Sequence, residues 1–513
     1  MRFFAALPLL FALTAPISLA QPCWSQTPPA KIETPTPGAP NLGDTIQPSS
    51  GNGGYEVTHY ALEMVFSEDL TTYVTTTTID ARATQALSQF NLDLKGNEIG
   101  YVWMDGKPAK WSRAGEELQI TPPAPLKKGA AFTVRVSVSG LTPSATASRL
   151  LHPLPLSLSQ SGDWIQTVNQ PASAHWFAAL DDHPSKKAPA TITIIAPSRF
   201  NSIANGDLVD TQPVKGDPTF AQRRFEVKQK LAPELLQIGV GPFTVVNSEG
   251  PHGIKLRSAL PTDQLQTLQP QLSVIPEIIQ FLEARLGPFP QSTYGLYVTP
   301  VGGDLETQSL TVVSIREMSP QSFKRNDEPA TLAHEASHEY FGNSVSPRRW
   351  SDAWLNEGHA TYYETLWKVA HGDSSLDDLM KRRYERQARL IARNGPVAKP
   401  NRAANRDPDL APYNDLIYSG GAVVLYALQQ KVGEETFKRI ERTWVETYRD
   451  GVAGTDDYIA LASRVSGQNL SEFLRSWLYS TSVPPMPNHP DWKLAPLQPR
   501  PGGLQLLSAP LQQ

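Results

Sequence analysis

Apolar and polar residues alternate along much of the first half of the chain, beginning at Tyr55 in GNGGYEVTHYALEMVF. A repeat of two residues is typical of a strand with one buried face. The stretches TTYVTTTTIDARAT, FNLDLKG, FTVRVSVSG and TITIIAP continue the pattern and are separated by Gly, Pro, Asn and Asp. The alternation therefore predicts a mainly β domain over residues 51–248.

Helical spacing replaces this alternation near Pro251. The stretch LQTLQPQLSVIPEIIQFLEARLG has the period of a helix and ends at Gly287. YGLYVTPVG and LTVVSI have the composition of strands, and helical patterns dominate from Asn326 to LSEFLRSWLYS. We expect an α+β domain over residues 249–484, followed by an irregular, proline-rich tail over residues 485–513.

The N-terminus MRFFAALPLLFALTAPISLA has the features of a secretory signal over residues 1–20. Arg2 provides the positive charge, an apolar segment follows, and Ser18-Leu19-Ala20 fits a cleavage site. A membrane anchor is the alternative, but the apolar run is short and contains two prolines. Residues 21–50 form a proline-rich linker. We expect export to a bacterial periplasm or exterior, with no membrane span after cleavage.

Composition limits the class of protein further. The chain has 513 residues, 40% of them hydrophobic, and a net charge of −4. This near balance argues against nucleic-acid binding, which usually requires a basic excess. Cys23 is the single cysteine, so no internal disulfide can form. The sequence does not predict an oligomeric state.

The stretch LAHEASHEYFGN carries the clearest chemical signal. His334 and His338 are four positions apart, so on a helix both imidazoles project from one face. Two such histidines can each bind Zn²⁺ at about 2 Å. Glu335 lies beside the first and can reach a metal-bound water without ligating the metal. The alternative is a partly buried helix that contains histidines by chance.

We expect this helix to begin at Asn326 or Asp327, with Pro329 in its first turn, and to end at Gly342. A catalytic zinc ion needs a third protein ligand and an open fourth position. Glu357, in WSDAWLNEGHATYYE, follows His338 after eighteen residues, enough for a turn and a returning helix. The pattern predicts one Zn²⁺ per chain.

HEASHEYFGN followed by DAWLNEGHATYYE resembles the zinc aminopeptidase family that includes aminopeptidase N and leukotriene hydrolase, peptidase family M1. GNGGYEVTHYAL, AHWFAALDDHPSKKA and LIYSGGAVVLYAL are similar to landmarks of its secreted bacterial members. The resemblance covers roughly residues 44–485. It implies a saddle-like N-terminal β-sheet domain, then a thermolysin-like catalytic domain. Because the sequence ends soon after the expected catalytic helices, we expect no large C-terminal helical domain.

The resemblance also implies a substrate site. GGDLETQ is similar to the family's G-x-M-E-N motif, with Leu305 and Thr307 in place of Met and Asn. Glu306 would then bind the free α-ammonium group of a peptide. Gly303, with Gly302, would let the peptide lie along this segment as an added strand. The alternative for Glu306 is a surface carboxylate on an edge strand.

Two further residues are assigned by the same resemblance. Tyr418 in IYSGGA would donate a hydrogen bond to the transition-state oxyanion, although Gly420 stands where the family often has lysine. Gln170 would be a second amine-binding residue. A core tyrosine and an ordinary loop glutamine are the alternatives. His359 replaces a common phenylalanine and is interpreted as structural.

We therefore expect a zinc aminopeptidase that acts on peptides with a free N-terminus. One alternative is an endopeptidase that uses the same metal in a more open cleft. Another is a peptide-binding scaffold that has lost catalysis.

Overall fold

The strands come first along the chain and the helices second. The computed structural model describes residues 33–142, 156–167, 173–178, 183–372, 374–401 and 414–495. The predicted signal segment and Gln170 lie outside these residues. No helix in the described ranges is long and apolar enough to cross a membrane. The described residues after Thr34 belong to one compact unit.

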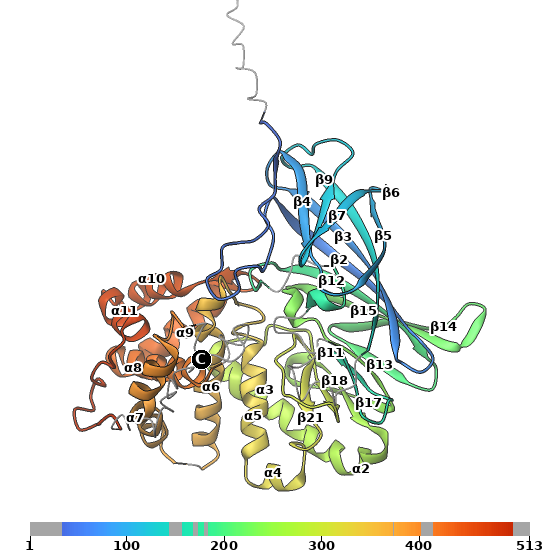
Figure 1. Cartoon of the computed structure of the whole chain (residues 1–513). Coiled ribbons are helices and arrows are strands. Elements are labelled where there is room, and N and C mark those ends of the chain that lie inside the picture. The colour runs from blue at the N-terminus through green and yellow to red at the C-terminus, as the bar shows by residue number, and fades with distance from the viewer. Residues whose placement is uncertain are drawn as a thin grey trace, which may run out of the picture. The chain divides into compact units, whose positions relative to one another are not determined.

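Most of the alternating stretches form an eight-stranded sheet, labelled in Figure 1, whereas FNLDLKG overlaps a strand of a smaller sheet. Its strands, in spatial order, are β14 (Asp207–Val214), β15 (Asp217–Leu231), β12 (Ala188–Pro197), β2 (Tyr55–Phe66), β3 (Thr72–Ala83), β9 (Ala131–Leu141), β5 (Glu98–Met104) and β6 (Lys107–Pro108). In β2 and β3 the buried and more exposed positions largely alternate, as the sequence pattern predicts. One face of the sheet therefore contributes to a hydrophobic core.

Two smaller sheets complete the β-rich region. The first contains β1 (Thr36–Pro37), β4 (Leu87–Asp93), β8 (Glu117–Thr121) and β7 (Lys110–Ala114). The second contains β10 (Leu156–Leu158), β11 (Ile165–Thr167), β16 (Ile238–Gly241) and β13 (Asn201–Ala204). Leu87, Phe90 and Ile120 of the first and Ile165 and Ile238 of the second are buried in the core of the large sheet.

A separate sheet introduces the second half of the chain. It contains β17 (Phe243–Glu249), β18 (Lys255–Pro261), β20 (Leu296–Thr299) and β21 (Thr311–Ser314), with β19 (Thr293–Tyr294) paired to β18. Trp164, Phe243 and Tyr297 pack together, and the Tyr297 hydroxyl donates to the carbonyl of Ile165 at 2.7 Å. These contacts join the β-rich region to the second half of the chain. The domain boundary at residue 248 stays a prediction.

Helices dominate the remaining chain. They are α2 (Leu265–Leu268), α3 (Val274–Leu286), α4 (Pro320–Lys324), α5 (Asp327–His338), α6 (Trp354–Ala370), α7 (Leu376–Asn394), α8 (Asp415–Val432), α9 (Glu434–Tyr448), α10 (Thr455–Ser466) and α11 (Ser471–Tyr479). Strands β22 (Ser346–Pro347) and β23 (Val452–Ala453) form a short pair. The helix expected over residues 265–287 is interrupted by a 3₁₀ segment, Gln269–Ser273, which contains Pro270.

Helices α6 and α8 approach each other at two glycines. A Cβ atom added to Gly421 would lie 2.7 Å from the Cα of Gly358 and 3.1 Å from the carbonyl oxygen of Trp354. Neither of these backbone atoms can move aside as a flexible side chain could. The pair of glycines therefore sets how closely α8 packs on the helix that carries Glu357.

Gly421→Ala should lower the free energy of unfolding by about 1–3 kcal/mol, because the added methyl group pushes two packed helices apart. Chemical denaturation followed by tryptophan fluorescence measures this change. Thr447→Ala, at an exposed position of α9, is the control and should change stability by no more than about 0.5 kcal/mol. Wild-type stability for Gly421→Ala would contradict the close approach of α6 and α8.

Candidate metal centre

Helix α5 presents the two histidines, and it begins where the sequence predicts. Asn326 occupies the N-cap position, with Pro329 in the first turn. Its role differs from the expected one, because the Asn326 side chain does not cap the helix. Its Oδ1 accepts a hydrogen bond from the indole of Trp367 at 3.1 Å, and its φ is 58°. Asn326 thus anchors α5 to α6.

The predicted end of this helix was wrong. Helix α5 ends at His338, four residues before Gly342. Gly342 has a φ of 116°, and a Cβ there would lie 2.1 Å from Oδ1 of Asn356. Gly342 is therefore required for close approach to α6 rather than for stopping α5.

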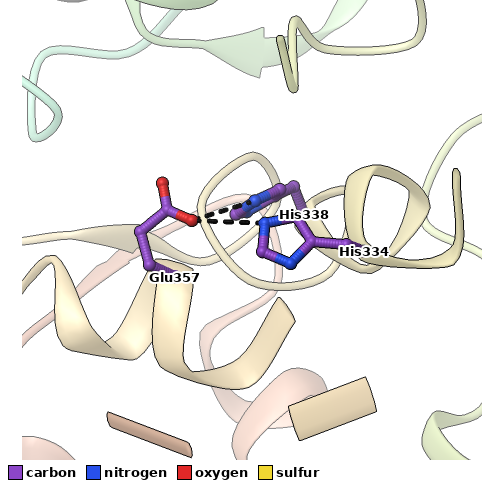
Figure 2. A group of neighbouring side chains, drawn as sticks. All are labelled: His334, His338 and Glu357. Carbon is purple, nitrogen blue, oxygen red and sulfur yellow. Dashed lines mark ion pairs between the residues drawn. The ribbon is translucent and has the colours of Figure 1, made fainter. Parts of the chain in front are cut away.

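Three side chains converge on one point between α5 and α6. Figure 2 shows the imidazoles of His334 and His338 directed at one oxygen of Glu357. The Nε2 atom of each histidine lies 3.4 Å from Oε2 of Glu357. All three residues are buried, and one ligand atom from each lies within 4.8 Å of the others.

This arrangement fits a tetrahedral metal ion. Ligand atoms bound at about 2.0–2.1 Å to a tetrahedral zinc ion lie about 3.3 Å apart, close to the separations between Glu357 and the two histidines. The Oε2 atom of Glu357 is buried without a hydrogen-bond partner. Two imidazoles and one carboxylate are a donor set that suits catalytic zinc.

Two neighbouring side chains orient the imidazoles of His334 and His338. Asn356 Oδ1 lies 2.5 Å from Nδ1 of His338, and Nδ1 of His334 lies 3.5 Å from Oε2 of Glu364. Glu364 also pairs with Lys368. Each histidine therefore has its Nδ1 engaged and its Nε2 turned toward the shared point, as metal-binding histidines require. The sequence analysis did not identify Asn356 and Glu364, although their positions on the same helix as Glu357 could have suggested them.

The electrostatics of the group reflect burial and close charges. Burial alone raises the pKa of the Glu357 carboxyl, but His338 and His334 outweigh this effect and hold that pKa at about 2. Burial raises the pKa of Glu335 to about 8, although the two histidines lower it. Both histidine pKa values are raised, because the nearby glutamates outweigh burial.

Glu335 and Glu306 lie beside the metal-binding group. Ligand atoms of Glu306, Glu335 and His338 come within 4.8 Å of one another. Glu306 is 5% exposed and Glu335 is 6% exposed. Each has one carboxylate oxygen without a hydrogen-bond partner, so Glu306 is not a surface carboxylate. Both acids are available to a ligand placed between them.

The segment before Glu306 forms an open approach to this group. Gly302 and Gly303 have φ values of 104° and 87°, and no atom lies within 4 Å of a Cβ built on either glycine. The Gln166 side chain, from β11, donates to the Gly302 carbonyl at 3.1 Å. This contact from the β-rich region was not predicted.

Tyr418, at the start of α8, lies against the metal-binding histidines. Its ring stacks on His334, with centroids 5.9 Å apart and planes 10° apart. Burial, and then the charges of Glu357, Glu306 and Glu335, raise its pKa well above the usual value. The phenol therefore stays protonated at neutral pH and can act as a hydrogen-bond donor.

His359 belongs to a separate buried cluster. Its Nδ1 contacts the carbonyl of Leu355 at 2.8 Å, and its Nε2 lies 3.3 Å from Oε2 of Glu441. Tyr458 donates to the other oxygen of Glu441 at 2.7 Å. This network ties α6 to α9 and α10, as expected for a structural histidine.

The chain matches known proteins in sequence. Residues 305–477 match the model of the peptidase family M1 domain. Tricorn protease-interacting factor F2 of Thermoplasma volcanium is 24% identical over 353 residues, 66% of this chain and 44% of that protein. Leucyl aminopeptidase of Saccharolobus solfataricus is 23% identical, over 63% of this chain and 42% of the relative. Mouse aminopeptidase N is 27% identical, over 55% and 31%.

The fold also matches a solved structure. The M1 zinc metallopeptidase from Deinococcus radiodurans aligns with a TM-score of 0.73 and 23% identity, over 87% of this chain and 98% of that one. The chain spans less than half the length of the curated relatives described above.

Asn356→Ala should weaken zinc binding about 10–100-fold, because His338 loses the partner that fixes its tautomer and orientation. Competition between the purified protein and a chromogenic chelator measures the affinity. Gln468→Ala, which changes an exposed amide in the turn after α10, should bind zinc as tightly as the wild type. Equal affinities for all three proteins would mean that Asn356 does not position the ligand.

Proposed function

Because this chain belongs to peptidase family M1, we propose that it is a zinc-dependent aminopeptidase that removes the first residue of peptides. The observation that carries the proposal is the burial of Glu306 and Glu335 beside the group His334, His338 and Glu357. A metal-binding group supports hydrolysis, and an additional unpaired carboxylate supports recognition of a free amine.

His334, His338 and Glu357 would hold the zinc ion. When bound, zinc lowers the pKa of water and polarises a carbonyl group. Asn356 and Glu364 keep the imidazoles turned toward the ion through their Nδ1 atoms. These contacts support a preorganised site that needs little rearrangement on binding.

Glu335 is the proposed general base. It accepts the proton of the attacking water and transfers it to the leaving nitrogen. A carboxyl group suits this role when its pKa is raised toward neutrality. The burial of Glu335, and its oxygen without a hydrogen-bond partner, support this assignment.

Tyr418 is the proposed oxyanion donor. Its phenol lies against His334 and stays protonated, so it can donate to the negative charge that develops on the attacked carbonyl. A donor already in place stabilises this charge without reorganisation at the moment of reaction.

Glu306 is the proposed amine-binding residue, and Gly303 provides room for the peptide backbone. Thr307 and Gln308, which follow Glu306, are buried, whereas Gly303 is exposed, which supports a peptide that extends from Glu306 toward Gly303. A peptide held there by its ammonium group presents only its first peptide bond to the metal. Gln170 remains a proposed second amine contact.

The finer features of the fold and location are also proposals. The β-rich region and the helical region would correspond to a saddle-like sheet domain and a thermolysin-like catalytic domain. The N-terminal residues would direct export to a bacterial periplasm or exterior. The resemblance of the sequence motifs supports both assignments.

The enzyme should release amino acids from aminoacyl-amide fluorophores and should not cleave their N-acetylated counterparts. Acetylation removes the positive charge that Glu306 is expected to bind. Fluorescence release, with zinc quantified in the same sample, measures both properties. Equal cleavage of the two sets would favour an endopeptidase. Bound zinc with neither set cleaved would favour a peptide-binding scaffold.

Glu335→Gln should retain zinc and lose turnover by about 10²–10⁴-fold, because the amide cannot accept the proton of water. Metal analysis and initial rates on an aminoacyl amide test the two parts separately. Glu446→Gln, which changes an exposed acid of α9, should behave as the wild type. Wild-type turnover by Glu335→Gln would exclude Glu335 as the base.

A further inference from the structure

Three acids next to the proposed amine site have no role in the mechanism above. Asp304 precedes Glu306 by two residues, Glu317 follows β21, and Glu328 lies in the first turn of α5. We call these three residues the acidic wall. Glu317 is exposed and Asp304 is partly exposed, whereas Glu328 is 2% exposed.

Two residues of the wall share a face of their element with a residue of the proposed site. Glu328 and Glu335 are seven residues apart on α5, which places them on one face, two turns from each other. Asp304 and Glu306 are two residues apart in a segment that bridges to β21 through Leu305, so their side chains share a face. Asp304 acts electrostatically on both Glu328 and Glu335.

Glu328 has no partner within the described residues. Its buried Oε1 has no hydrogen bond, and no ion pair involves either of its oxygens. Burial, followed by nearby carboxylates, raises its pKa to about 8. These carboxylates are Asp304, Glu317 and Glu335. The nearest basic residue along the chain, Arg325, is already paired with Asp327 at 2.7 Å.

Asp304 is also only partly engaged. One oxygen accepts a hydrogen bond from the backbone N–H of Ser314 at 3.0 Å, which fixes the carboxylate in place. The second oxygen has no such bond to a described residue. A carboxylate held in this way, at a partly exposed position, is ready to receive a cation from the cleft.

The direction of a bound peptide follows from the burial of the chain around Glu306. Thr307 and Gln308, on one side of Glu306, are buried, whereas Gly303 on the other side is exposed. A peptide whose ammonium group is held at Glu306 must therefore extend from Glu306 toward Gly303. Residues in extended chains advance by about 3.3 Å, so the second residue of the peptide comes level with Leu305, and a long side chain there extends toward Asp304.

We propose that the acidic wall binds a cationic side chain, lysine or arginine, at the second residue of the substrate, immediately after the cleaved bond. This inference rests on the proposed aminopeptidase function. The spacing of the three acids favours a side chain over a metal ion. Among the described residues, the two groups of ligand atoms close enough to hold a metal do not include Asp304, Glu317 or Glu328.

The test compares the tripeptides Ala-Lys-Ala and Ala-norleucine-Ala, which differ in the ammonium group at the second position. We expect kcat/KM for alanine release to be about tenfold higher for the lysine peptide, as one charge-assisted contact would give. Asp304→Asn and Glu328→Gln should each reduce this ratio to about threefold or less. Comparing two peptides on one variant cancels any change in overall activity.

Three controls test whether the lysine preference depends on the acidic wall and on the second residue. Glu472→Gln, which changes an exposed acid on α11, should keep the wild-type ratio. Lys-Ala-Ala and norleucine-Ala-Ala should be cleaved with similar kcat/KM, because the wall lies beyond the first residue. An alanyl-amide fluorophore measures the underlying aminopeptidase activity, because it has no second amino-acid residue.

The outcomes separate the two proposals. Cleavage of the alanyl amide with equal rates on the lysine and norleucine tripeptides would overturn the acidic wall and leave the aminopeptidase intact. A lysine preference that survives both Asp304→Asn and Glu328→Gln, or that appears at the first residue, would also overturn it. No cleavage of the alanyl amide or of any tripeptide would overturn the proposed function and this inference together.

Discussion

The contact between His338 and Asn356 is the constraint on which the metal-binding group depends. It joins the last residue of α5 to the first turn of α6, so it sets the register of one helix against the other. Glu357 is adjacent to Asn356, and its carboxylate therefore reaches the two imidazoles only in this register. Gly342 allows the close approach, because a side chain there would displace the amide of Asn356, whereas Gly358 allows α6 to approach α8. A change of one residue in register would rotate Glu357 by about 100° away from the histidines.

Side chains of the β-rich region donate hydrogen bonds to backbone carbonyls around the same site. Lys187 donates hydrogen bonds to the carbonyls of Asn343 and Ser344 at 2.7 and 2.8 Å, and the Asn343 side chain donates to the carbonyl of Glu306 at 2.8 Å. Gln166 holds Gly302 in the same way. The Gly302 end of the segment that carries the proposed amine-binding residue is thus held by β11, and the Glu306 end is held by Asn343, whose carbonyl Lys187 contacts. A helical region alone would leave this segment without those supports, so the N-terminal region would help to position a peptide under the proposed function.

Local sequence patterns predicted individual strands and the metal-binding residues, but they did not predict contacts between distant segments. Alternation located β2 and β3 to within a residue or two, because a strand with one buried face leaves a direct record in its sequence. The four-residue spacing of His334 and His338, and Glu357 after eighteen intervening residues, located a metal-binding group. The spacing of the two histidines was informative because one turn of a helix places both on the same face. The end of α5 was misplaced at Gly342, since a glycine needed for contact with Asn356 looks the same in sequence as a helix terminator. The contact of Gln166 with Gly302 joins residues 136 positions apart, and no local pattern could indicate it.

The distribution of carboxylates along the cleft is unusual for a site that binds only a metal and an amine. Glu357 faces the histidines, and Glu306 has a buried oxygen available for an ammonium group. Asp304 and Glu328 remain, each with an oxygen that no described residue satisfies. Burying an acid without a partner is costly, and folding tolerates it where a ligand supplies the missing charge. Under the proposed function, these three places would receive the amine, the reacting carbonyl and the next side chain of an extended peptide. A buried carboxyl group without a partner holds its proton more tightly, as the pKa of about 8 for Glu328 indicates, and a cationic side chain beside it would favour the ionised form.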